Sequence, residues 1–202
     1  FLKKIAEQIT ANAVTPEQKI SAVNNYVKQN IVWNDYSRKY TDTPLKKVME
    51  DKKGSSAEIN LLLASLLEKA GFNVSAVLVS TRDHGFVRQT VPISSQFNYV
   101  LCLVNLDNKQ ILLDATDKLL PTGVLPERCL NGSGFVVSAK GSYSWVALTA
   151  KVKSLLYYNV DLTLSAEGEL KGQITVDQSG YYAHSGRKKY FTKGKDEYIK
   201  DF

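Results

Sequence analysis

The chain has 202 residues, of which 44% are apolar and 23% are charged, an ordinary composition for a globular protein with a real core. No stretch of about 18 uninterrupted apolar residues occurs, so we expect no transmembrane helix. The net charge of +6 comes from short pairs and triplets of basic residues without interleaved aromatic residues, which argues against nucleic-acid binding.

Three helices are predicted in the first quarter of the chain. Apolar residues recur at helical spacing over residues 1–12. The second helix is marked by Thr15, which can cap it, by Pro16 at its first position and by Gln18, which completes a capping box. A further short helix is expected over residues 43–54, with its apolar residues facing inward.

The most strongly marked helix begins after Ser55. Ser55 and Glu58 form a capping box, and Gly71 can end the helix in a left-handed conformation. Between them, six apolar residues follow the spacing of one buried helix face: Ile59, Leu62, Leu63, Leu66, Leu67 and Ala70. We expect this helix to lie at the centre of the core.

After Gly71 the apolar pattern changes from helical to alternating. Strands are predicted over residues 74–80, 99–105 and 110–113, the last two joined by a turn at 107–108, with weaker candidates at 134–137 and 145–148. Helices followed by strands indicate an α+β fold in which the central helix packs on an antiparallel sheet.

The C-terminal part has a different pattern. Residues 155–164 and 170–176 alternate strongly on either side of a turn at 166–168, which predicts a β-hairpin. A polar segment that begins near Gly180 is a helix candidate. We therefore expect a first domain over residues 1–149 and the start of a β-rich region over residues 150–202. The absence of an initial methionine and of a clear final element suggests a piece of a longer protein.

Three segments resemble the transglutaminase-like superfamily in their order along the chain. Residues 54–58 (Gly-Ser-Ser-Ala-Glu) open the central helix, Tyr99 begins a strand, and Asp114 ends the next strand. Family members place a catalytic Cys at the helix N-terminus, a His on the following strand and an Asp on the next. The resemblance implies a papain-like core in which Ser56 replaces the Cys, Tyr99 replaces the His, and Asp114 is kept.

These replacements remove the chemistry that the family needs. A helix N-terminus lowers the pKa of a thiol, whereas the hydroxyl of Ser56 depends on a neighbouring base. Tyr99 is a poor base at neutral pH because the ordinary pKa of tyrosine is about 10. We expect the Tyr99 hydroxyl to donate to Asp114 in place of the usual histidine, and the first turn of the helix to offer free N–H groups.

Other candidate residues have weaker support. His84 lies in a turn-rich loop next to Asp83, and His184 lies in the C-terminal region, so neither is expected to act as a catalytic base. Cys102 and Cys129 form no C-x-x-C motif, and whether they form a disulfide stays open. We expect no cofactor and no metal site.

The segments 113–118 and 125–131 resemble a bacterial branch of the family whose members are large, exported and multidomain. The resemblance implies an inactive transglutaminase-like domain, periplasmic or at the cell surface, that serves as a binding or structural module. Its expected partners are neighbouring domains, or a peptide or glycan in the former substrate groove. The first alternative is a hydrolase or acyltransferase that uses Ser56 with an unrecognised base. The second is a binder of anionic surfaces.

Overall fold

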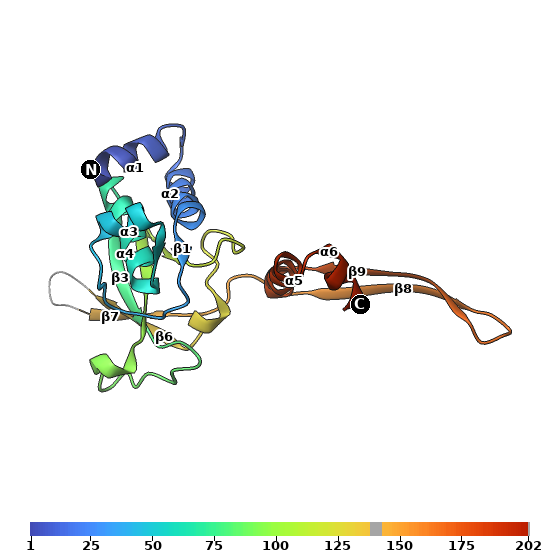
Figure 1. Ribbon diagram of the computed structural model, residues 1–202. Helices are drawn as coiled ribbons and strands as arrows, with labels where there is room; N and C mark the ends of the chain where they lie inside the picture. The colour runs from blue at the N-terminus through green and yellow to red at the C-terminus, as the bar shows by residue number, and fades with distance from the viewer. Residues whose placement is uncertain (138–142, 202) are drawn as a thin grey trace. The chain divides into compact units, whose positions relative to one another are not determined.

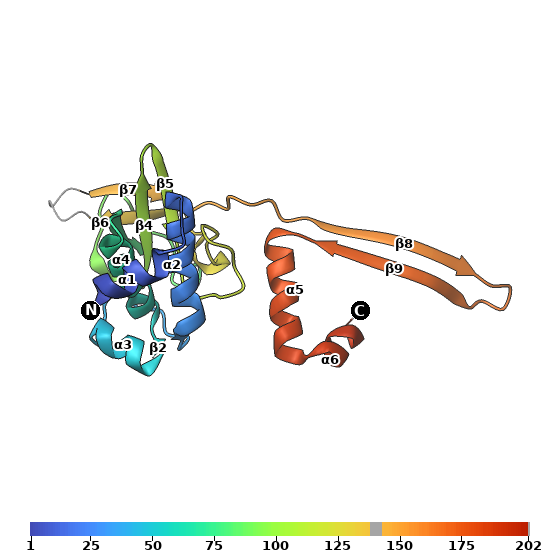
Figure 2. The same ribbon diagram turned by 90° about the horizontal axis from the view of Figure 1, so that it is seen from above.

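The computed structural model describes residues 1–137 and 143–201. These residues divide into two units, Phe1–Ala150 and Lys151–Phe202. Helices and an antiparallel sheet form the first unit, and a long hairpin followed by two helices forms the second (Figures 1 and 2). No helix within the described ranges is long and apolar enough to cross a bilayer.

The first unit contains four helices, α1 (Leu2–Thr10), α2 (Pro16–Asn30), α3 (Leu45–Asp51) and α4 (Ser56–Lys69). Two of them, α2 and α4, begin where the capping residues predict. Both predicted capping boxes are present, at Thr15 with Gln18 and at Ser55 with Glu58. Gly71 follows α4 with a φ of 94°, a value that side chains other than glycine disfavour.

The strands of the first unit form a five-stranded antiparallel sheet in the order β5-β4-β3-β6-β7. The strands are β3 (Asn73–Val79), β4 (Tyr99–Leu106), β5 (Lys109–Leu113), β6 (Ser133–Val137) and β7 (Tyr143–Ala147). A short parallel pair, β1 (Val32–Trp33) and β2 (Lys53–Gly54), precedes α4. The predicted α+β fold is confirmed.

The core surrounds β4, because α4 packs on β4 and β3 while α1 and α2 pack on α4 (Figures 1 and 2). Cys102 and Val104 belong to the cluster that contains the apolar face of α4. Tyr99 and Leu101 belong to a second cluster, together with Cys129. β4 is therefore buried on both sides, and a polar group on it, such as the Tyr99 hydroxyl, must find its partner inside the protein.

The second unit contains the antiparallel strands β8 (Leu156–Leu164) and β9 (Leu170–Gln178), and the helices α5 (Gly180–Lys193) and α6 (Lys195–Lys200). The hairpin register places a row of apolar residues on one face, and these residues are exposed: Leu156, Tyr158, Val160, Leu162, Leu164, Leu170 and Ile174. The two strands have nine residues each, and the two helices have 14 and 6. The unit thus contains the predicted hairpin, followed by helices from Gly180 onward.

Candidate functional site

Ser56 is the first residue of α4, at the position predicted from the family resemblance, and it is fully buried. Its hydroxyl makes two hydrogen bonds to one residue of the loop before α3. The Oγ atom accepts from the Arg38 N–H at 2.8 Å and donates to the Arg38 carbonyl at 2.9 Å. Within the described residues the hydroxyl has no bond to Tyr99, to Asp114 or to either histidine.

The first turn of α4 does not present free donors in the way the sequence suggests. The Ser55 N–H donates to the Glu58 carboxylate at 2.7 Å, and the Ser56 N–H donates to the Tyr36 carbonyl at 3.1 Å. The expectation of free N–H groups at Ser55 and Ser56 is therefore wrong. The reason is that the capping box uses the Ser55 donor, while the loop after β1 continues alongside β2 and uses the Ser56 donor.

The predicted contact between Tyr99 and Asp114 is present. The Tyr99 hydroxyl donates to Asp114 Oδ2 at 2.7 Å, and both residues are buried. The β4–β5 register, in which Cys102 faces Leu113, brings the end of β5 close to the start of β4. Burial, followed by the nearby Asp114 carboxylate, raises the pKa of Tyr99 well above its ordinary value. The phenol therefore stays protonated and cannot serve as a general base at neutral pH.

Asn60, one turn after Ser56 on α4, completes the surroundings of Asp114. Its Nδ2 donates to Asp114 Oδ2 at 2.9 Å and to the Val100 carbonyl at 2.9 Å, and its Oδ1 accepts from the Ala115 N–H at 2.9 Å. Thr116 adds donors to the other carboxylate oxygen, from its N–H at 2.9 Å and its hydroxyl at 2.5 Å. Asp114 is thus held by α4, β4 and its own loop.

Arg128 is the cation of this network. Its Nη2 donates to the Tyr99 hydroxyl at 3.2 Å and to Thr116 Oγ1 at 2.5 Å. The guanidinium carbon lies 4.2 Å from the centre of the Trp33 ring, a cation–π distance. Burial alone would lower the pKa of Arg128, but its hydrogen bond to Tyr99 and the negative charge of Asp114 hold the pKa above its ordinary value. Arg128 therefore stays charged beside the Asp114 carboxylate.

Sequence reasoning missed Asn60 and Arg128 as site residues. The available signal for Asn60 was a single amide inside an otherwise apolar helical run. Arg128 belongs to the 125–131 segment, but nothing in that segment indicates a role for it. Its role depends on Trp33 and Tyr99, which are distant in sequence. Both roles are visible only once the tertiary contacts are known.

The remaining candidates lie outside this network or add no base to it. His84 is exposed, and its Nε2 lies 3.1 Å from the Ser95 carbonyl. His184 belongs to the second unit. Cys102 and Cys129 are both free and buried, so they form no disulfide. Burial, followed by the Asp114 charge, raises the pKa of Cys129 well above its ordinary value, which leaves an unreactive thiol. The described residues contain no cluster of His, Cys, Asp or Glu suited to a metal ion.

Two hollows flank the loop that binds Ser56. One, of about 400 Å³, is mostly polar and includes Arg38, Asp42 and Glu58 in its lining. The other, of about 190 Å³, shares Arg38 and Asp42 and adds Phe97 and Asn98. Because Ser56, Tyr99 and Asp114 are buried, a ligand at this site would contact the loop and these hollows rather than the three triad positions.

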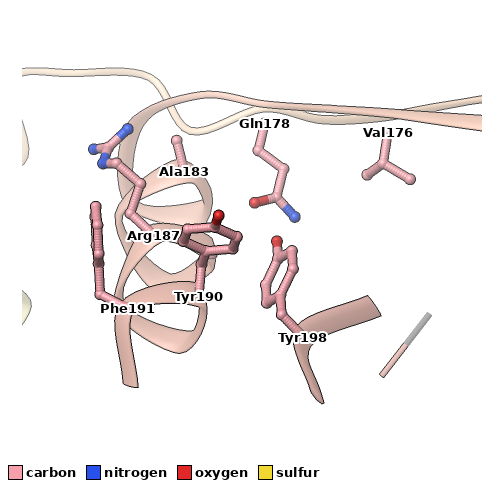
Figure 3. A pocket seen from close by; sticks show the side chains of 8 residues that line it. Val176, Gln178, Ala183, Arg187, Tyr190, Phe191 and Tyr198 are labelled. Atoms are coloured by element: carbon pink, nitrogen blue, oxygen red, sulfur yellow. The ribbon is translucent and has the colours of Figure 1, made fainter. Parts of the chain in front are cut away.

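A separate hollow of about 380 Å³ lies within the second unit, between β9 and the two helices (Figure 3). Three aromatic rings line it, from Tyr190, Phe191 and Tyr198, and the side chain of Gln178 points toward it from the end of β9. Tyr190 and Tyr198 meet edge to face, with ring centres 5.6 Å apart. All of its lining residues belong to the second unit, so it forms no part of the Ser56–Asp114 site.

The family model described as the transglutaminase-like superfamily matches residues 3–151. The chain belongs to the transglutaminase-like superfamily. The matched range contains Ser56, Tyr99 and Asp114. A comparison with curated proteins found no match.

Among solved structures, the first of the three described next has a fold similar to that of this transglutaminase-like protein. A candidate protease from Parabacteroides distasonis superimposes with a TM-score of 0.51 and 17% identity, over 73% of this chain and 28% of that one. A protein described as a TGase gives 0.41 and 17%, over 57% and 30%. A candidate cysteine protease from Cytophaga hutchinsonii gives 0.45 and 11%, over 88% and 50%. The chain spans half or less of the length of these proteins.

Proposed function

We propose that this transglutaminase-like domain is catalytically inactive and serves as a binding or structural module of a larger protein. The observation that carries the proposal is the 2.7 Å hydrogen bond from Tyr99 to Asp114. It gives the carboxylate the partner that a catalytic histidine would provide, yet the phenol has a raised pKa and takes no proton from Ser56.

The surroundings of Ser56 support the same proposal. A serine nucleophile needs a base within hydrogen-bonding distance, but both hydrogen bonds of this hydroxyl go to main-chain atoms of Arg38. The alternative, a hydrolase or acyltransferase that uses Ser56, would require Arg38 to move away and a base to approach. His84, bound to the Ser95 carbonyl, would have to leave that contact to do so.

The wider setting is also a proposal. The chain corresponds to 28% of the length of the Parabacteroides protein, which fits a module within a longer chain whose neighbouring domains are its partners. We place the protein in the periplasm or at the cell surface of a bacterium, on the resemblance of segments 113–118 and 125–131 to the exported branch. A peptide or glycan ligand would contact the rim of the former groove, where Phe97 and Asn98 line the smaller hollow.

The proposal is tested by assaying the protein for amine incorporation into glutamine peptides and for peptide cleavage, together with serine- and thiol-directed covalent probes. We expect no turnover and no labelling of Ser56. Ser56→Ala reports background labelling, and Ser95→Ala serves as a matched control at an exposed serine. Turnover that survives Ser95→Ala but disappears in Ser56→Ala would establish the hydrolase or acyltransferase alternative.

A further inference from the structure

Residues 34–43, here called the strap, cross the N-terminus of α4 between the two hollows. The strap contributes Arg38 and Asp42 to both hollows, so it separates them. Beneath it, Ser56 is fully buried. Burial of Ser56 therefore depends on the strap as well as on the core around α4.

The strap is anchored at its ends, by Asn34 to Gly54 and by Thr43 to Glu58, but none of its residues is buried. At its centre, Arg38 exchanges two hydrogen bonds with the Ser56 hydroxyl, and the Tyr36 carbonyl accepts from the Ser56 N–H. Farther along, the Lys39 ammonium donates to the Ser94 carbonyl, and the Tyr40 hydroxyl lies 3.0 Å from Ser94 Oγ. Lys39 and Tyr40 thus latch the strap to the loop on the other side of the smaller hollow.

Apolar burial, the usual source of resistance to local opening, is missing from the strap. The side chains of Tyr36 and Tyr40 are 64% and 62% exposed. Near the start of the strap, Asp35 has a φ of 67°, a left-handed conformation that costs a non-glycine residue free energy. Segments with exposed hydrogen bonds and few apolar contacts open at much lower free energy than the core.

We propose that the strap is a lid that opens locally, without unfolding of the domain, and thereby exposes Ser56 and joins the two hollows into one groove. The latch, formed by the contacts of Lys39 and Tyr40 with Ser94, sets how often the strap opens. This inference holds whether or not the domain is an enzyme, because it concerns access to Ser56 and not chemistry at it.

The test replaces Ser56 by Cys and measures the rate at which a small thiol reagent labels each cysteine under native conditions. Cys102 and Cys129 are internal references, because both are fully buried in the core and report global unfolding. We expect the cysteine of Ser56→Cys to react at least about tenfold faster than Cys102 and Cys129, since local opening is less costly than unfolding. Equal rates at all three positions would overturn the proposal.

The latch is tested in the same background with Lys39→Met and Tyr40→Phe combined. Loss of two exposed hydrogen bonds should raise the labelling rate at position 56 by about three- to tenfold and leave the rate at Cys102 unchanged. Lys46→Met, which removes a lysine from a surface ion pair with Glu50 on α3, is the matched control. An unchanged rate at position 56 in the latch variant would contradict the assigned role of the latch.

Native Ser56 provides a second measurement that does not disturb the hydroxyl. Hydrogen exchange of the Arg38 and Ser56 amides should proceed by local opening, and should be faster than that of the β4 amides. If the Arg38 and Ser56 amides exchanged as slowly as the β4 amides, the lid proposal would be contradicted. Fast labelling in Ser56→Cys would then have to be an effect of the substitution itself.

Discussion

Ser56 and Asp114 mark two halves of one site that are held in different ways. On the helix side, Ser56 is bound by main-chain atoms of a strap with no buried residue. On the sheet side, Asp114 is bound by the buried side chains of Asn60 on α4 and Tyr99 on β4, and by the half-buried Thr116 of the loop after β5. The hydrogen-bond partners of Asp114 are therefore largely part of the core, whereas the hydroxyl partner of Ser56 lies in a segment that is not buried.

The largest effect is expected at Asn60, which joins the two halves. Asn60→Leu removes three hydrogen bonds and leaves the Ala115 N–H, the Val100 carbonyl and the Asp114 carboxylate short of partners. Unfolding in urea should show a loss of about 3 kcal/mol or more, because each unsatisfied buried group costs about 1–3 kcal/mol.

Asn24 offers the matched control for that variant. It is fully buried on α2, and neither of its amide atoms has a hydrogen-bond partner among the described residues. Asn24→Leu should therefore stay within about 1 kcal/mol of the wild type or be more stable. Equal losses in both variants would mean that the bonds of Asn60 do not account for its effect.

On the sheet side, we expect the free energy of unfolding to depend on pH through Cys129. The folded state holds its thiol protonated well above the ordinary pKa of about 8.5, whereas the unfolded chain releases that proton. Stability from this group is therefore complete below about pH 8.5 and declines as the pH rises, by up to about 1.4 kcal/mol per pH unit.

Cys129→Ala isolates this effect. Burial lowers the pKa of Lys28, so this group makes the free energy of unfolding rise with pH in alkaline solution. It does so equally in both proteins. We expect the free energy of unfolding to fall less steeply between pH 8.5 and 10 in Cys129→Ala than in the wild type. Parallel curves would argue that the thiol titrates normally.

The smallest effect is expected on the helix side. Ser56→Ala removes the hydroxyl that binds Arg38, but the freed main-chain groups lie in a strap that water can reach. The free energy of unfolding should change by less than about 1 kcal/mol. A loss as large as that of Asn60→Leu would show that the strap is part of the core and would erase the difference between the two halves.

The sequence predicts the fold well where local signals act alone. Capping residues located the starts of α2 and α4, and alternation located β3, β4, β5 and the hairpin. The family resemblance singled out Ser56, Tyr99 and Asp114, and the structure brings Tyr99 and Asp114 into contact. The Tyr99–Asp114 bond was also predictable, because a buried carboxylate needs a hydrogen-bond donor and Tyr99 lies on the neighbouring strand.

Features that depend on long-range contacts could not be predicted in the same way. The strap has no helical or strand pattern, so its use of the Ser56 N–H and hydroxyl was invisible in the sequence. Arg128 is placed by Trp33 and Tyr99, which lie 95 and 29 positions earlier in the chain. Alternation in β8 predicted one apolar face, but not that this face is exposed.

The central claim is that Tyr99 replaces the histidine as a structural partner of Asp114. It is tested most directly by the thermal unfolding of Tyr99→Phe, which removes one hydroxyl and keeps the ring. We expect a clear fall in melting temperature, corresponding to about 1–3 kcal/mol, because Asp114 loses a donor and Arg128 loses an acceptor. An unchanged melting temperature would contradict the claim, and the network around Asp114 would have to be explained without Tyr99.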